Sequence, residues 1–189
     1  MFRQLGFVIA LCVGISAAVF AQKSDNSKDN FDVKSSVGDL HLGSDADAKK
    51  VGLPLYPGAR LKADDDENSS RANLSLLTEA FGFKLVVAKY ESEDAPDKVI
   101  AFYRDKLRKF GKVLECHSQK HGGGIEVNDD DKDSSKSKEL KCDENSGPVT
   151  EFKVGTEDDQ HIVAIEPRAG QGATLSLVYV HSRGKRGEI

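Results

Sequence analysis

Two runs of alternating apolar and polar residues constrain the fold of this 189-residue chain most strongly. In residues 71–78, Leu74 and Leu76 fall on the same side by period two. Residues 83–91 continue the alternation and are apolar on both sides near their middle. The connection between them, 79–82, is short enough for a hairpin. We therefore expect an antiparallel pair whose second strand lies inside a sheet.

A helix is predicted between Asp94, a candidate N-cap, and Gly111, a candidate C-terminal residue. Pro96 suits the first turn, and the apolar residues of the segment recur at helical spacing. Further strands are expected at 37–42, 112–116, 139–142, 151–154, 161–166 and 174–181. This order predicts an α+β fold, an antiparallel sheet with one main helix packed on a face.

The first 21 residues have the three-part layout of a secretory signal peptide. Arg3 precedes an uncharged run over 5–20, and Val19 and Ala21 occupy cleavage-type positions. We therefore expect export to the periplasm or the medium, with no stable membrane span after cleavage. An uncleaved anchor is the alternative, because the apolar run approaches the length that crosses a bilayer.

The rest of the chain divides by composition into a polar leader, one domain and a tail. The expected bounds are a flexible leader over 22–36, a single α+β domain over 37–182 with a disordered acidic loop near 128–137, and a tail over 183–189. The formal net charge of −4 argues against a nucleic-acid-binding protein.

Two cysteines, Cys116 and Cys142, remain after removal of the signal peptide and flank the acidic loop. Because disulfides persist in exported proteins, we predict that they form a bridge. Closing a loop of this length stabilises the fold by about 3.5 kcal/mol in the chain-entropy treatment.

The same region also contains residue types that bind metals, His117 and His121 beside Cys116. Neighbouring residues of a strand point to opposite faces, so Cys116 and His117 are poorly placed to chelate one ion. The spacing also lacks the second tight pair that is typical of zinc sites. No cofactor is predicted, and a metal or redox site that uses both cysteines and nearby histidines stays an alternative.

The sequence does not predict an enzyme. It lacks G-x-S-x-G, H-E-x-x-H and the phosphate-binding G-x-x-x-x-G-K-[ST], although a hydrolase without a recognisable motif stays an alternative. The predicted helix has a basic face, for which anionic envelope components are candidate ligands and simple solvation is the other interpretation. Its residues are Arg104, Arg108, Lys109 and Lys112.

Two motifs carry a resemblance, Tyr-Pro-Gly-Ala at 56–59 and P-x-x-V-x-x-F-Y-R-x-x-L at 96–107. The chain resembles a group of small exported bacterial proteins of uncharacterised function that combine this turn with this helix. The resemblance implies no activity and no catalytic residue. The signal peptide, the predicted disulfide and the missing reactive motifs favour a non-catalytic binding or interaction domain, with another envelope component as the candidate partner.

Overall fold

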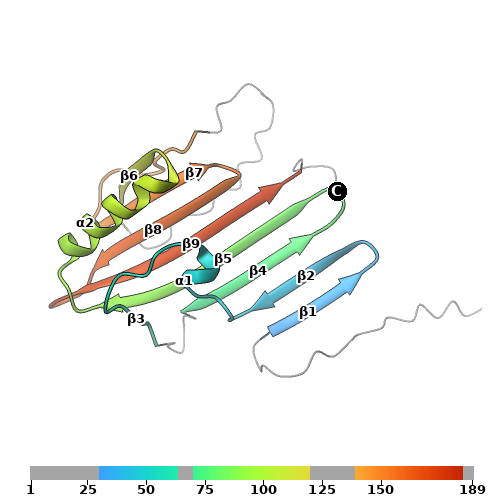
Figure 1. The fold of residues 1–189 in the computed structure, drawn as a ribbon, viewed down its shortest axis with the longest axis horizontal. Helices are drawn as coiled ribbons and strands as arrows, with labels where there is room; N and C mark the ends of the chain where they lie inside the picture. Colours follow the sequence, from blue (N-terminus) through green and yellow to red (C-terminus); the bar gives the residue numbers. More distant parts are fainter. Residues whose placement is uncertain (1–29, 64–69, 120–138, 185–189) are drawn as a thin grey trace, which may run out of the picture.

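The computed structural model describes residues 30–63, 70–119 and 139–184, and their strands form one nine-stranded antiparallel sheet (Figure 1). The strand order is β1-β2-β4-β5-β9-β8-β7-β6, and β3 pairs with β5. The bounds are β1 (Asn30–Ser35), β2 (Gly38–Gly43), β3 (Arg60–Leu61), β4 (Arg71–Leu77), β5 (Gly82–Ser92), β6 (Val113–Ser118), β7 (Val149–Thr156), β8 (Asp159–Pro167) and β9 (Ala173–Arg183).

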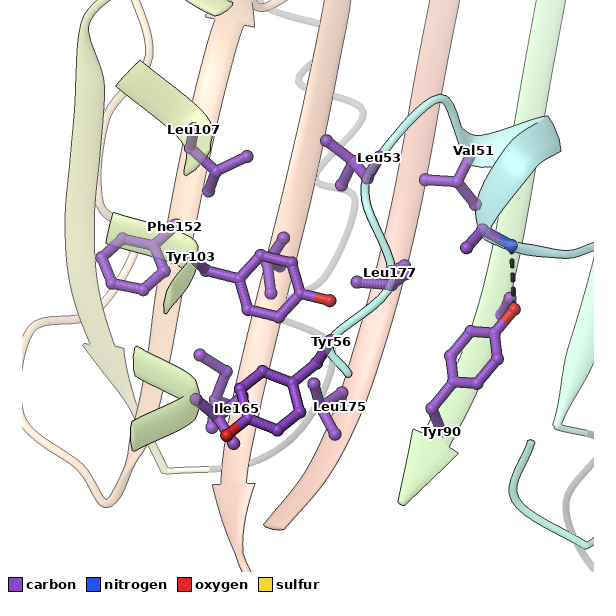
Figure 2. Packing of buried hydrophobic residues seen from close by; sticks show 14 of the residues in the cluster. Val51, Leu53, Tyr56, Tyr90, Tyr103, Leu107, Phe152, Ile165, Leu175 and Leu177 are labelled. Atoms are coloured by element: carbon purple, nitrogen blue, oxygen red, sulfur yellow. Dashed lines mark hydrogen bonds between the residues drawn. The ribbon is translucent and has the colours of Figure 1, made fainter. Parts of the chain in front are cut away.

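Two α-helices, α1 (Ala48–Val51) and α2 (Pro96–Lys106), lie on the same face of the sheet, which we call the helix face. A 3-10 turn, η1 (Leu107–Phe110), continues α2. The helices and the segment that follows α1 bury their apolar side chains against β5, β7, β8 and β9 (Figure 2). The largest fully buried side chains include Tyr103, Leu107, Phe152, Ile165, Leu175 and Leu177. The opposite side of the sheet is called the back face below.

Helix α2 begins at Pro96, whose fixed φ and missing N–H suit the first helical position. Val99 and Tyr103 lie on its buried side, and the Tyr103 hydroxyl donates to the Pro54 carbonyl at 3.1 Å. Asp94 does not cap the helix as expected. Its carboxylate instead accepts hydrogen bonds from Lys98, at 3.0 Å, and from the Tyr56 hydroxyl, at 2.9 Å.

Residues 48–59, from α1 to the Tyr-Pro-Gly-Ala turn, cross the helix face, and hydrogen bonds hold this segment at both ends. At its start, the Ala48 N–H donates to the Tyr90 hydroxyl at 2.8 Å. At its end, Gly58 adopts a φ of 80° and the Ala59 N–H donates to the Tyr56 carbonyl, as a type II turn requires. The Tyr56 ring packs edge-on against Phe102 at 5.2 Å between centroids. This turn therefore links the segment to α2.

The expected α+β class with one main helix is wrong, because strands account for 52% of the described residues and helices for 15%. Pairing extends β5 and β9 to 11 residues each, beyond the expected ends of both strands. The leader expected to be flexible over 22–36 also contributes β1, which pairs with β2 along its whole length. Conversely, residues 139–142 do not form the expected strand.

Several expectations concern residues that the structure does not describe. The predicted signal peptide over 1–21, the acidic loop near 128–137, His121 and the tail beyond Gly184 all lie outside the described ranges. Among the residues within those ranges, no helix combines the length and the apolar character needed to cross a membrane.

Candidate interaction site at the β1 edge

Strands β1, β2 and β4 are amphipathic, and apart from Leu77 at the end of β4 they direct their large apolar side chains to the back face. Val33 lies opposite Leu40, which lies opposite Leu76 on the next strand. Two residues along each strand, Phe31, Leu42 and Leu74 form a second row on the same face. Cross-strand neighbours of this kind share one face of a sheet. We call the six residues the back-face ladder: Phe31, Val33, Leu40, Leu42, Leu74 and Leu76.

The apolar surface continues from the back-face ladder across the middle of the sheet. Leu74 and Leu76 lie opposite Leu85 and Phe83 of β5. Leu85 in turn lies opposite Val180 of β9. The back face is therefore apolar over at least five neighbouring strands.

No helix in the described part of the chain covers the back-face ladder. Helix α1 contacts β5 and β9, whereas α2 contacts β7 and β8, and both pack on the helix face. Phe31 keeps 57% of its surface exposed, Leu42 41% and Leu76 37%. Exposed apolar side chains are ordinary one at a time, but a contiguous set of them is typical of an interaction surface.

On the helix face, the same three strands carry a polar network centred on His41. Its Nδ1 lies 2.7 Å from an oxygen of Asp32, and its Nε2 lies 3.3 Å from an oxygen of Asp45. Asn73 donates to Asp45 at 2.9 Å, and Lys50 contacts the other Asp45 oxygen. The hydrogen bond to Asp32 raises the pKa of His41, and the Lys50 ammonium lowers the pKa of Asp45.

This network has a structural role, because both ring nitrogens of His41 are directed at carboxylates. When protonated, His41 donates from both ring nitrogens and links β1 to β2 and to the loop after β2. The charged residues of the edge thus hold β1 in its register with β2.

The outer edge of β1 has no partner strand among residues 30–63, 70–119 and 139–184. All six residues of β1 are exposed. On the helix face of the strand, Asp32 lies opposite His41 and Lys34 lies opposite Asp39. The edge therefore presents an apolar row on one face and one charge of each sign on the other.

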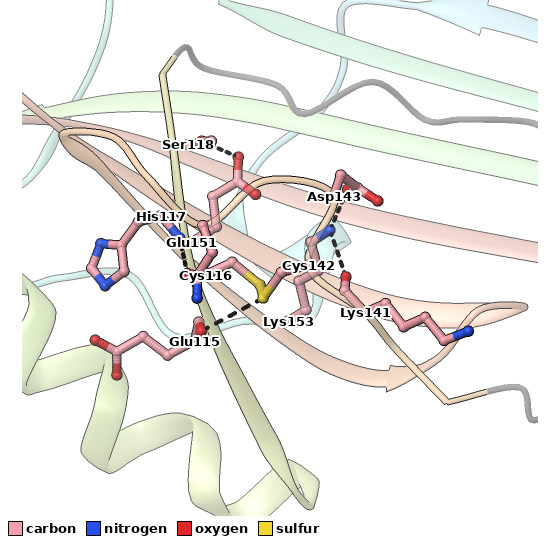
Figure 3. Close-up of a disulfide and its surroundings, with 10 residues drawn as sticks. Glu115, Cys116, His117, Ser118, Lys141, Cys142, Asp143, Glu151 and Lys153 are labelled. Carbon is pink, nitrogen blue, oxygen red and sulfur yellow. Dashed lines mark hydrogen bonds and ion pairs between the residues drawn. A yellow bond between two sulfur atoms is a disulfide. The ribbon is translucent and has the colours of Figure 1, made fainter.

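The other edge of the sheet, β6, is covered by the segment after Glu139 (Figure 3). Cys116 and Cys142 are joined with their Cα atoms 5.5 Å apart, as predicted from the sequence. Asn145 accepts a hydrogen bond from the His117 N–H at 3.1 Å, and Glu144 accepts one from the Gln119 N–H at 3.0 Å. Side chains of this segment thus bind backbone donors of β6 and of the residue after it.

The same segment neutralises a buried lysine on the back face. The Lys153 ammonium donates to Asp143 at 2.7 Å and to the Lys141 carbonyl at 3.2 Å (Figure 3). Glu151, which is also buried, accepts from Ser118 at 2.9 Å. At this end the back face is therefore polar, and its polar groups have partners.

Cys116 and His117, the metal-site candidates that lie within the described ranges, are not brought together to bind one ion. His117 and Cys116 are neighbours on β6, so their side chains leave the strand on opposite faces. Within the described ranges, no group of three or more His, Cys, Asp or Glu residues is arranged to hold a metal ion.

The predicted basic face of the helix is partly neutralised by neighbouring carboxylates. Arg104 makes two hydrogen bonds to Glu115, at 2.6 and 3.1 Å, and Lys112 binds Glu139 at 2.7 Å. The Lys109 ammonium lies 5.0 Å from the ring centroid of Phe110. Arg108 completes the set at the end of η1. Two of the four expected cations are thus in ion pairs rather than available to an anionic ligand.

Sequence reasoning missed an aromatic row at the end of the helix face. The rings of His161 and Tyr179 pack in a tilted arrangement with their centroids 4.8 Å apart, and the Phe110 ring centroid lies 5.6 Å from that of His161. Burial lowers the pKa of His161, which favours the neutral form of its ring. A Cβ at Gly52 would lie 3.2 Å from its Nε2. This histidine is therefore a packing residue, and only the pairing of β8 with β9 reveals the row.

The β1 edge was also missed, although its signal is visible in the sequence. The four residues Phe-Asp-Val-Lys at 31–34 alternate with period two, but they stand within a polar stretch that was interpreted as a leader.

Comparisons of the chain with protein-family models, with curated proteins and with solved structures found no match.

Proposed function

We propose that this protein is a non-catalytic, exported interaction domain that binds an extended, amphipathic strand of a protein partner at the β1 edge. The observation that carries the proposal is the edge of β1, which has no partner strand among the described residues, next to the back-face ladder, which no described helix covers. A strand added there gains backbone hydrogen bonds to β1, and its own apolar side chains extend the ladder.

The charges of β1 define the chemistry of the strand that fits. Directly opposed residues of antiparallel strands share a face, so apolar residues of the partner must lie beside Phe31 and Val33. On the other face, the partner needs a cation opposite Asp32 and an anion opposite Lys34. A strand that alternates apolar residues with one aspartate and one lysine meets both requirements.

Other features favour binding over chemistry at the alternative sites. Cys116 is 1% exposed, so thiol–disulfide exchange at its sulfur requires local opening. Both ring nitrogens of His41 are directed at carboxylates, and His161 is half-buried with its Nε2 close to Gly52, as described above. These observations support an interaction domain over the redox and hydrolase alternatives.

A peptide titration tests the proposal. The probe is a fluorescent peptide, Thr-Ile-Asp-Ile-Lys-Ile-Thr, and the reference is Thr-Ile-Ile-Asp-Lys-Ile-Thr, which has the same composition but places its aspartate and its lysine on opposite faces of the strand. We expect saturable fluorescence anisotropy with the first peptide and at least about tenfold weaker binding of the second.

Two protein variants sharpen the titration. Lys34→Asp should weaken binding of the alternating peptide, because it places two aspartates opposite each other. Lys106→Asp, on the exposed side of α2, should leave binding unchanged. Equal binding of the two peptides, or full binding to the Lys34→Asp variant, would overturn the proposal.

A further inference from the structure

We propose that the strand bound at this edge is β1 of a second copy of the chain. Two β1 strands pair antiparallel about a two-fold axis at Val33 and join two sheets edge to edge. This inference rests on the proposed function and names its partner.

The requirement that paired residues share a face limits the register. Shifting two antiparallel strands by one residue places apolar side chains opposite charged ones. Only shifts of two residues keep Phe31 and Val33 on the back face of both copies. The two-fold axis must then pass through a residue of β1, and the two registers that pair five residues of each strand place it at Asp32 or Val33.

The charges of β1 select the register at Val33. An axis through Asp32 places two aspartates opposite each other, and an axis through Lys34 does the same with two lysines. An axis through Val33 places Asp32 of each copy opposite Lys34 of the other, twice in one interface. Opposite charges at directly paired positions stabilise a sheet and like charges destabilise it.

The register at Val33 also continues the charge order that already exists within each sheet. Inside one copy, Asp32 lies opposite His41 and Lys34 lies opposite Asp39. Across the axis, the row then contains His41 and Asp32 of one copy, followed by Lys34 and Asp39 of the other. Its charges alternate in sign at each step when His41 is protonated.

On the back face, the same pairing places the two Val33 side chains side by side and Phe31 of each copy opposite Ser35 of the other. The two back-face ladders become one surface. Each copy contributes a strand of six residues, so the contact belongs to the small size class of protein interfaces. We therefore expect association that depends on concentration rather than a permanent dimer.

Sedimentation velocity over a range of protein concentrations tests this pairing with two single variants. Asp32→Lys creates two lysine–lysine oppositions in a homodimer, and Lys34→Asp creates two aspartate–aspartate oppositions. Each variant alone should associate at least about tenfold more weakly than the unmodified protein. An equimolar mixture of the two should associate as the unmodified protein does, because every opposition is then attractive.

The mixture also controls for folding, since an unfolded variant cannot restore association. Lys106→Asp serves as the matched control and should sediment like the unmodified protein. Failure of the mixture to associate, when the unmodified protein does associate, would overturn the register. A protein that stays monomeric at every concentration but binds the alternating peptide would overturn self-association and leave the proposed function standing. If neither association occurs, both proposals fail.

Discussion

The two edges of the sheet differ in whether a described segment covers them. At β6, a segment joined through the Cys116–Cys142 disulfide lies against the strand and supplies side-chain partners to its backbone. At β1, no described strand or helix does the same. An open edge is a template for another strand unless something covers or charges it.

The back face changes character between these two ends. Next to the covering segment it carries Glu151 and Lys153, both buried and both hydrogen-bonded. At the β1 end it carries aliphatic and aromatic side chains that stay exposed. Buried polar residues lie on the part of the back face where neighbouring segments provide their hydrogen-bond partners. Exposed apolar residues lie on the part that no described helix covers. This difference is what the interaction proposal explains.

Removing the disulfide at the β6 edge should cause the largest decrease in the free energy of unfolding. Cys142→Ser frees the covering segment and restores the freedom of the unfolded chain, which should lower the free energy of unfolding by about 3.5 kcal/mol. Chemical denaturation of the oxidised protein measures the loss. An unchanged unfolding midpoint would show that the bridge does not stabilise the β6 edge.

Replacing Asp143, the partner of the buried Lys153, tests the same edge with a smaller expected loss of stability. Asp143→Asn leaves the Lys153 ammonium, whose side chain is 9% exposed, without its carboxylate. We expect a loss of about 1–2 kcal/mol in denaturant unfolding, since hydrogen bonds to charged groups are the stronger ones. Asp105→Asn removes the carboxylate of an exposed ion pair and should change little. Equal effects would mean that burial does not distinguish the two sites.

The open edge should respond to pH through His41. Its pKa is raised above 6.5 in the folded protein, mainly by the hydrogen bond to Asp32. The stabilisation is therefore complete below pH 6.5 and is lost as the pH rises through the raised value. Because the pair is partly exposed, the loss should be at most about 1 kcal/mol.

Thermal unfolding on either side of that window measures the change, with Asp32→Asn as the comparison. The variant should show a smaller decrease in stability with rising pH than the unmodified protein. An equal decrease in both would assign the pH dependence to another group.

The smallest effect on stability is expected on the back face of β1. Val33→Thr should change the free energy of unfolding by less than about 0.5 kcal/mol, because the side chain is exposed. Val163→Thr makes the same change at a fully buried position of β8 and should cost about 2 kcal/mol. A large loss for Val33→Thr in dilute protein would show that the back-face ladder is covered within one copy.

Much of the local structure could be predicted because its signals are short-range. The hairpin of β4 and β5 and the helix near Pro96 follow from alternation, spacing and proline placement. The cysteine pair was identified from composition and compartment. The predicted N-cap at Asp94 was wrong, because Tyr56 and Lys98 compete for its carboxylate. Lys98 lies in the first turn of α2, whereas Tyr56 is 38 positions away along the chain.

The candidate interaction site at the β1 edge could not be predicted from such short-range signals. Strand β1 is only six residues long, and a hairpin of two strands is marginal until a third strand pairs with it. Here β4 provides that third strand, 28 or more positions away along the chain from β2. The polar surroundings of 31–34 therefore outweighed a short alternation in the sequence.

The sequence by itself determined which segments alternate, where the main helix begins and which two cysteines can join. The tertiary structure decided which face of each strand is covered and which edge of the sheet stays open. The reason is that β5 reaches its neighbour β9 about 90 positions later in the chain. Such pairing depends on the packing of both faces, and no local pattern records it.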